Sequence, residues 1–233
     1  MPKSFIKFKG VLSNSEKHNT REMKVDNMIE PSNQNFSAMD ESIADRLEKI
    51  RATYEKNIGQ KMQKKAKPIR EATVLLPDDK NEVNSHLLFK LSDELEKRFG
   101  IKTFQWHIHN DEGHKDKVTG ELKYNYHAHL VVDWTNEEGR SLRLNSDDMI
   151  EIQTLTAEIL QMERGERGSK TLSLNHREYR GFMEIRDKLS LEFNKELTED
   201  QEVKIREEIV ERREELKAKK DGDKKAGRGE IKR

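Results

Sequence analysis

The sequence predicts an α+β fold: a central, mostly antiparallel sheet flanked by helices, with a helical C-terminal extension. Apolar residues make up 32% of the chain and charged residues 39%, so a core can form only where apolar residues concentrate. They concentrate in short alternating or β-branched runs, which are interleaved with segments of helical periodicity. These segments follow no strict strand–helix–strand alternation, which argues against a parallel sheet.

The N-terminal half of the chain carries both strand and helix signals. Strands are indicated by alternating or β-branched runs, and helices by apolar residues that recur every three or four positions. Pro68 and Gly100 follow the two helical segments, since proline disfavours helix before it and glycine suits the position just past a helix end. We therefore expect strands over residues 4–9 and 71–76, a loop over 13–35, and helices over 39–64 and 80–99.

The C-terminal half begins with two strand-like runs, 103–109 and 127–134, joined by a polar segment typical of a hairpin turn or loop. Farther on, Asn145 or Ser146 is placed to cap a helix, and Thr198-x-x-Gln201 fits a capping box. We expect a short strand over 142–144, helices over 146–162, 177–196 and 199–219, and a loop between residues 163 and 176.

We expect three parts: a domain over residues 1–180, a helical extension over 181–219 and a basic, disordered tail over 220–233. The chain has 45 basic and 45 acidic residues, so its net charge identifies no class of partner. Basic residues nevertheless cluster over residues 3–24 and 61–70, and such clusters are either solvated surface or phosphate-binding patches.

The chain has no cysteine, so it forms no disulfide, and any metal site must use His, Asp or Glu. No apolar run approaches the ~18 residues that a membrane helix needs, and no signal-peptide pattern opens the chain. We therefore expect a cytoplasmic protein without a membrane segment.

Five of the eight histidines lie between residues 107 and 129 and include two His-x-His pairs. Residues i and i+2 of a strand project from the same face, about 6.5–7 Å apart. His107 therefore shares a face with His109, and His127 with His129. If the two strands are neighbours, both pairs meet on one face of the sheet. Surface histidines at two strand ends are the alternative interpretation.

Such a face would suit a catalytic metal ion. Three neutral imidazoles leave coordination positions open, and imidazole accepts Zn, Mn, Fe, Co, Ni or Cu. Asp111 and Glu112, just after the first strand, could act as further ligands or support the ligands from behind. The residues thus predict a metal site without identifying its ion.

Four motifs together resemble a known family. HNDE at residues 109–112 with HAH at 127–129 resembles the His-x-Asp-Glu…His-x-His motif of Mob/Pre (MobV-type) plasmid mobilisation relaxases, in the His-hydrophobic-His endonuclease superfamily. KHNTR at 17–21 is similar to the family's His-Asn-x-Arg motif. PIREATVL at 68–75 and the Arg-Gly, Gly-Ser and Glu-Tyr pairs within 164–179 resemble two further blocks in the same order.

The resemblance spans about residues 5–180, with one departure. Fourteen residues, 113–126, separate Glu112 from the second histidine pair, where the family usually has a few. A longer loop costs little closure entropy, so the site can survive the insertion. The insertion adds His114 as a competing ligand, while His107 has no counterpart in the motif and is interpreted as a neighbour of the site.

The resemblance implies a fold like that of relaxases and rolling-circle nucleases, and a DNA-nicking activity. Relaxases of this type cut one strand at an origin of transfer and stay attached to its 5′ end. By this resemblance, His18 is the nucleophile that forms a phosphoramidate, while His109, His127 and His129 hold a divalent metal ion. Mn or Mg is the ion expected in function, and the imidazoles would also accept Zn, Co or Ni.

The same resemblance gives roles to the residues around His18. Arg21 would clamp the scissile phosphate bidentately, and Asn19 would orient His18 or the DNA. Asp111 or Glu112 would take the imidazole proton or support the metal.

The expected partner is single-stranded or hairpin DNA at an origin of transfer, bound along its backbone by basic side chains. Other mobilisation or coupling proteins are further expected partners, and the charged final helices could form a homodimer. The candidate DNA-binding residues are Lys17, Arg21, Lys24, Lys64, Lys65, Lys67 and Arg70.

Two alternatives stay open. A rolling-circle replication initiator of the same superfamily would use a tyrosine nucleophile, for which Tyr126 is the candidate because it adjoins the second histidine pair. A DNA-binding accessory protein would use the metal structurally and would not cleave DNA.

Overall fold

The computed structural model describes residues 3–25, 28–29, 35–115, 120–167, 174, 176–193, 195 and 197–229. It divides the chain into two compact units, residues 1–167 and 168–233. Residues 168–173, which carry the Gly-Ser pair of one predicted motif, lie outside the described residues, as does the end of the predicted tail at 230–233. Within the described part of the chain, no helix has the length and apolar character needed to cross a membrane.

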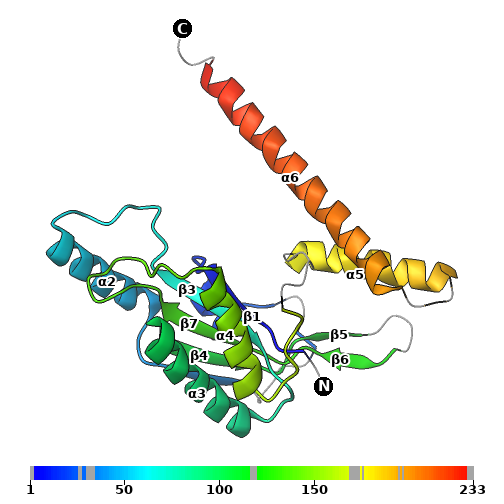
Figure 1. Ribbon diagram of the computed structural model, residues 1–233, viewed down its shortest axis with the longest axis horizontal. Coiled ribbons are helices and arrows are strands. Elements are labelled where there is room, and N and C mark those ends of the chain that lie inside the picture. Colours follow the sequence, from blue (N-terminus) through cyan, green and yellow to red (C-terminus); the bar gives the residue numbers. More distant parts are fainter. Residues whose placement is uncertain are drawn as a thin grey trace. The chain divides into compact units, whose positions relative to one another are not determined.

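The first unit is built on a five-stranded sheet in which every neighbouring pair is antiparallel (Figure 1). Its strands are β1 (Ile6–Gly10), β2 (Phe36–Met39), β3 (Ile69–Leu75), β4 (Lys102–His109) and β7 (His127–Asp133), and a separate hairpin consists of β5 (Gly113–Lys115) and β6 (Leu122–Tyr124). The strand order is β1-β3-β7-β4-β2, so the two histidine-bearing strands are neighbours. The predicted α+β class with an antiparallel sheet is confirmed.

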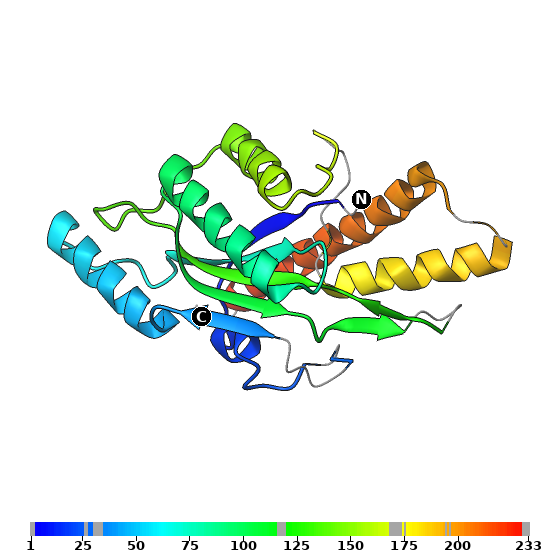
Figure 2. The ribbon, with the colours of Figure 1, turned by 90° about the horizontal axis from the view of Figure 1, so that it is seen from below.

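Helices cover both faces of this sheet. They are α1 (Ser15–Asn19), α2 (Ile43–Ile58), α3 (Asn81–Phe99) and α4 (Ser146–Ile159). Figure 2 shows α3 and α4 on one side of the sheet and α1 and α2 on the other. The larger core includes Leu91 and Leu95 of α3 with Leu130 of β7. The smaller core lies on the opposite face, where Ile50 of α2 packs with Val131.

Local signals set several helix ends. Gly59 and Gly100 follow α2 and α3 with φ of 74° and 71°, a left-handed conformation that glycine adopts without steric cost. Asn145 caps α4, because its side chain accepts hydrogen bonds from the backbone N–H groups of Asp147 and Asp148. The predicted stop at Gly100 and cap at Asn145 are confirmed.

Three segments of this unit differ from the sequence-based expectation. The expected loop over residues 13–35 contains α1, whose five residues are too few for local propensity to predict a helix. Residues 36–39 form the edge strand β2, which pairs with β4, and the helix expected over 39–64 extends only over Ile43–Ile58. The strand expected over 142–144 is not formed, and an isolated bridge between Thr135 and Ser141 lies just before it.

The second unit consists of α5 (His176–Phe193) and α6 (Glu199–Gly229). The predicted capping box is present at the start of α6: the N–H of Thr198 donates to Oε1 of Gln201 at 2.9 Å, and the N–H of Gln201 donates back to Oγ1 at 3.4 Å. Arg213 of α6 pairs with Glu178 of α5 at 3.2 Å. α6 continues past residue 219, where its end was expected, so the part of the expected tail up to Gly229 is helical.

Candidate functional site

The histidines of β4 and β7 meet on the sheet face that α1 and α2 cover. In the antiparallel register, His109 lies opposite His127, and His107 lies opposite His129. All four residues are buried, with at most 4% of their surface exposed. The face is identified by Val131, two positions after His129, because it packs in the core beneath α2. The convergence predicted from the strand period is therefore present.

Backbone carbonyls hold two of these rings. The ring centroids of His109 and His127 are 5.2 Å apart. Nε2 of His109 donates to the backbone oxygen of Asn19 at 2.9 Å, and Nδ1 of His127 donates to that of Asn125 at 2.7 Å. Because a carbonyl oxygen only accepts hydrogen bonds, each ring carries its proton on this outer nitrogen. The lone pairs are then on Nδ1 of His109 and Nε2 of His127.

Glu71 holds the third ring. It is 1% exposed on β3, and its Oε1 lies 2.5 Å from Nδ1 of His129 and 3.3 Å from Nζ of Lys9. Burial alone would raise the pKa of Glu71, but the hydrogen bond from His129, together with the charge of Lys9, lowers it to about 2. Glu71 is therefore ionised and leaves Nε2 of His129 as the free nitrogen. It had no predicted role, although a charged residue inside a β-branched strand was an available signal.

The free nitrogens of His109 and His129 fit a metal ion, and these two residues form a group of close donor atoms with His18. Nδ1 of His109 and Nε2 of His129 are buried without a hydrogen-bond partner, which is uncommon for buried polar atoms. Burial lowers the pKa of His129 to about 4 and that of His109 further, so both rings are neutral near pH 7. Neutral nitrogens that are backed by outer hydrogen bonds are a donor set that divalent transition ions bind.

Glu112 adds a carboxylate to the group. Its Oε1 lies 3.9 Å from Nδ1 of His109, and its Oε2 lies 3.8 Å from Nε2 of His127. Donor atoms of these three residues all lie within 4.8 Å of one another, so Glu112 could be a further ligand. Its backbone oxygen accepts from the N–H of Asn125 at 2.9 Å, which closes the base of the inserted hairpin beside the site.

His18 reaches the same group from α1. Its ring centroid lies 5.3 Å from that of His129 and 5.6 Å from that of His109, and 30% of its side chain is exposed. Burial lowers the pKa of His18 against the opposing charge of Glu112, so the ring is neutral near pH 7. A residue about ninety positions upstream in the sequence is thus brought to the histidine cluster.

Tertiary contacts, rather than length, hold α1 in place. Oε1 of Glu16 accepts hydrogen bonds from the backbone N–H of Ile43 at 3.1 Å and from Nε2 of Gln105 at 2.7 Å. Asn19 ends the helix and is 1% exposed; its carbonyl binds His109, while its side-chain oxygen and nitrogen have no hydrogen-bond partner. The short helix is therefore fixed at both ends against the sheet.

Arg21 joins the N-terminal segment to the residues after β4. Its φ is 61°, a left-handed conformation that is uncommon outside glycine. The guanidinium contacts both oxygens of Asp111, at 3.0 and 2.5 Å, and Oε1 of Glu112 at 2.8 Å. Asn35 donates to Asp111 as well, at 2.7 Å. The donors that a phosphate clamp would use are therefore engaged with carboxylates, and the clamp role of Arg21 stays a prediction.

Two solved structures share this architecture. A MobM relaxase domain (MOBV; Mob_Pre), Mn-bound and in complex with a 22-nucleotide oriT DNA of plasmid pMV158, matches with a TM-score of 0.59 and 15% identity, over 78% of this chain and 100% of that chain. The same domain with a 23-nucleotide DNA matches with a TM-score of 0.57 and 13% identity, over 78% and 99%. This chain has the fold of a MobV-type relaxase domain. No protein-family profile and no curated protein sequence matches the chain.

The other histidines considered as ligands, and the alternative nucleophile Tyr126, lie apart from the group formed by His109, His127 and His129. Both nitrogens of His107 have partners, Oγ of Ser37 at 2.9 Å and Oε1 of Gln105 at 3.3 Å. His114 is exposed on β5 and belongs to neither group of metal donors found among the described residues. Tyr126 packs against the larger core, which lies on the other face of the sheet.

The predicted DNA-binding residues differ in how accessible their side chains are. Arg70 stacks its guanidinium on Trp134, 4.0 Å from the ring centroid, and Arg21 is held in the ion pairs described above. The five lysines are exposed: Lys17, Lys24, Lys64, Lys65 and Lys67. The lysines are thus accessible to a DNA backbone, whereas the two arginines are engaged within the protein.

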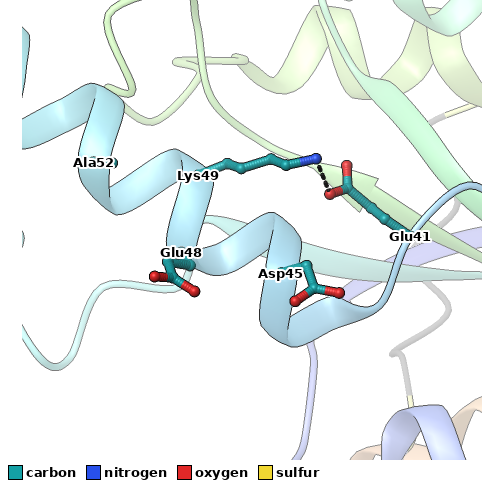
Figure 3. A pocket seen from close by; sticks show the side chains of 5 residues that line it. All are labelled: Glu41, Asp45, Glu48, Lys49 and Ala52. Atoms are coloured by element: carbon teal, nitrogen blue, oxygen red, sulfur yellow. Dashed lines mark hydrogen bonds and ion pairs between the residues drawn. The ribbon is translucent and has the colours of Figure 1, made fainter.

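A hollow elsewhere on the relaxase fold contains no histidine. It has a volume of about 460 Å³ and lies along α2. Nζ of Lys49 lies 2.6 Å from Oε2 of Glu41, and Figure 3 shows the two side chains pointing toward each other. Its lining residues are Glu41, Asp45, Glu48, Lys49 and Ala52. None of the predicted site residues therefore lines this hollow.

Proposed function

We propose that the chain is a metal-dependent, site-specific single-strand DNA nickase and strand transferase, a mobilisation relaxase that acts at an origin of transfer. The observation that carries the proposal is the convergence of His18 on His109 and His129, two buried imidazoles whose inner nitrogens have no hydrogen-bond partner. A nucleophile beside a metal-binding face is the arrangement that phosphodiester transfer needs. Mn-bound, DNA-bound structures of the same fold support this assignment.

His109, His127 and His129 would hold the divalent ion through their inner nitrogens. When bound, the ion would polarise the scissile phosphate and offset its developing negative charge. Mn or Mg is the proposed ion in function, because both accept phosphate oxygens readily, while Zn, Co or Ni would also fit the imidazoles. Glu71 would keep His129 in the tautomer that binds metal.

His18 would attack phosphorus with a ring nitrogen. The P–N bond forms as the bond to the 3′ oxygen breaks, which leaves a 5′-phosphohistidine and a 3′ hydroxyl that receives the imidazole proton. Glu112 is placed to relay this proton, since its Oε1 lies 4.0 Å from Nε2 of His18. Asp111 is less suited, because Arg21 and Asn35 already bind its oxygens. The reverse steps would rejoin the DNA ends.

Two neighbouring residues would help to position the DNA. Asn19 would orient His18 or the DNA, and its side-chain amide is buried without a hydrogen-bond partner. Arg21 would exchange a carboxylate partner for the scissile phosphate when DNA binds. The exposed lysines would follow the backbone of single-stranded or hairpin DNA. We also propose that the chain binds other mobilisation or coupling proteins and that it forms a homodimer through its final helices.

Trapping a covalent adduct tests the proposal. The chain would be incubated with Mn²⁺ and 3′-labelled single-stranded oligonucleotides that tile the DNA flanking its own gene. We expect labelled protein, loss of the label with a chelator, and a modification that peptide mass spectrometry maps to His18. Absence of any adduct, together with no nicking of a supercoiled plasmid carrying the same DNA, would overturn the proposal.

Two variants separate the proposal from its alternatives. His18→Ala should abolish the adduct, whereas Tyr126→Phe should leave it intact. The opposite result would identify a rolling-circle initiator with a tyrosine nucleophile. Metal and DNA binding without cleavage would identify an accessory protein with a structural metal.

A further inference from the structure

His18 differs from the other three imidazoles in how it is held. Each of the others donates an outer N–H to a fixed acceptor, whereas Nε2 of His18 lies 4.0 Å from Oε1 of Glu112, beyond hydrogen-bonding distance. The side chain of His18 is 30% exposed, against 1–5% for the other three. His18 is therefore the member of the cluster with the most freedom to move.

The spacing of His18 nevertheless suits a shared ion. Donor atoms of His18, His109 and His129 all lie within 4.8 Å of one another. Two nitrogens that bind one ion at about 2.1 Å each are at most ~4.2 Å apart, so a small approach of these donor atoms is enough, and His18 is the residue with the most freedom to make it. Glu112 competes for the same position, but its Oε1 is already 2.8 Å from Arg21.

We propose that His18 is a fourth ligand of the metal in the DNA-free protein and leaves the ion when a phosphodiester binds. This inference rests on the proposed function, because it assigns a resting state to the proposed nucleophile. Ligation uses the same lone pair that would attack phosphorus, so bound His18 is inactive. A non-bridging phosphate oxygen replaces the imidazole, and the lone pair of His18 is released beside the phosphorus with no change of oxidation state.

The exchange depends on the ion. Mn and Mg favour oxygen ligands, so a phosphate oxygen displaces His18 readily. Ni and Zn bind imidazole more strongly and hold His18 on the ion. We therefore expect Ni²⁺ and Zn²⁺ to bind more tightly than Mn²⁺ while supporting slower adduct formation. His18→Ala should narrow the difference in affinity between these ions, because the extra imidazole is gone.

Co²⁺ is the probe for the test, because its visible absorption reports the number and kind of its ligands. Wild-type chain, His18→Ala and the surface variant His86→Ala would be titrated with Co²⁺ without DNA. We expect His18→Ala to weaken binding by at least ~10-fold and to lower the absorption, while His86→Ala matches wild type. Dimethyl phosphate, the simplest phosphodiester, should remove the difference in absorption between wild type and His18→Ala.

A second measurement uses only the wild-type chain, so it does not depend on whether a variant folds. Pulsed electron paramagnetic resonance of the Mn²⁺-loaded wild-type chain counts bound imidazoles, and the count should fall from four to three on adding dimethyl phosphate. Equal Co²⁺ affinity in wild type and His18→Ala, with three imidazoles throughout, would overturn the inference. If four imidazoles stay bound to the ion after dimethyl phosphate is added, the proposed replacement of His18 by a phosphate oxygen is wrong.

The outcomes also separate this inference from the proposed function. If DNA is trapped on His18 but His18→Ala binds Co²⁺ as tightly as wild type, then His18 is not a ligand in the DNA-free protein, and the nickase proposal stands. If His18 binds Co²⁺ and no DNA is ever cleaved, the ligation stands and the nickase proposal is wrong.

Discussion

Glu71 and His129 form a buried carboxylate–imidazole pair, with Oε1 of Glu71 2.5 Å from Nδ1 of His129 and neither residue more than 4% exposed. The pair joins β3 to β7, and Nε2 of His129 is left free on the other side of the ring. A carboxylate behind a metal-binding imidazole fixes the tautomer of the ring and raises its basicity. The metal affinity should therefore depend on a residue that binds no metal itself.

Replacing Glu71 by Gln should weaken Mn²⁺ or Co²⁺ binding by about 10–100-fold. The amide oxygen still accepts the Nδ1 proton, but the negative charge that makes the imidazole a stronger donor is lost. Isothermal titration calorimetry measures the change directly. Glu82→Gln, at an exposed position of α3, is the matched control and should bind like wild type. Wild-type affinity in Glu71→Gln would contradict the role given to this carboxylate.

The sheet face that holds the histidine cluster could be predicted, because it follows from a local rule. His127 and His129 are two residues apart on one strand, as are His107 and His109, and the strand period assigns each pair to one face. To predict that both histidine pairs lie on one face of the sheet, it was enough to assume that the two strands are neighbours. The antiparallel register then decides which rings meet, and it could not be read from the spacing.

The contacts that complete the site are long-range, which is why the sequence did not predict them. Arg21 and Asp111 are 90 residues apart, and so are Asn19 and His109. α1 has five residues, too few for a stable isolated helix, and depends on the bonds that Glu16 makes with distant segments. Periodicity describes one element at a time, so it cannot identify such partners.

Metal binding should stabilise the folded chain. Because the site is assembled from β4 and β7, the unfolded chain binds the ion weakly, and Mn²⁺ at 100 times its Kd should add about 2.7 kcal/mol to the free energy of unfolding. Urea denaturation with Mn²⁺ and with EDTA measures the difference. His129→Ala should show no such difference, whereas His86→Ala on the surface of α3 should keep it. Equal stability of the wild-type chain in both conditions would contradict a preformed site.

Removing Arg21 should destabilise the fold as well as the reaction. Asp111 and Glu112 are 1% and 7% exposed, and Arg21→Ala would leave both carboxylates buried without their cation, at a cost of about 3–5 kcal/mol. Arg21→Lys keeps the charge but loses the bidentate geometry, so an intermediate loss is expected. Urea denaturation of both variants checks this order, and Asp111→Asn in the Arg21→Ala background should recover part of the loss. A fully stable Arg21→Ala would show that these ion pairs contribute nothing.

The metal-free chain should lose stability as the pH falls from 6.5 to 4.5. Burial lowers the folded-state pKa of His107 to about 4 from 6.5, and that of His129 similarly, so the unfolded chain takes up protons first. Each such imidazole should cost up to about 1.4 kcal/mol per pH unit in this window. The folded-state pKa of Glu71, about 2, lies below its ordinary 4.5, so the stabilisation by Glu71 is lost only below this window. Urea denaturation in EDTA at pH 7, 6 and 5 measures the slope, and a chain equally stable at all three would contradict the buried neutral histidines. His107→Asn should give a shallower slope than wild type, because one of these groups is removed.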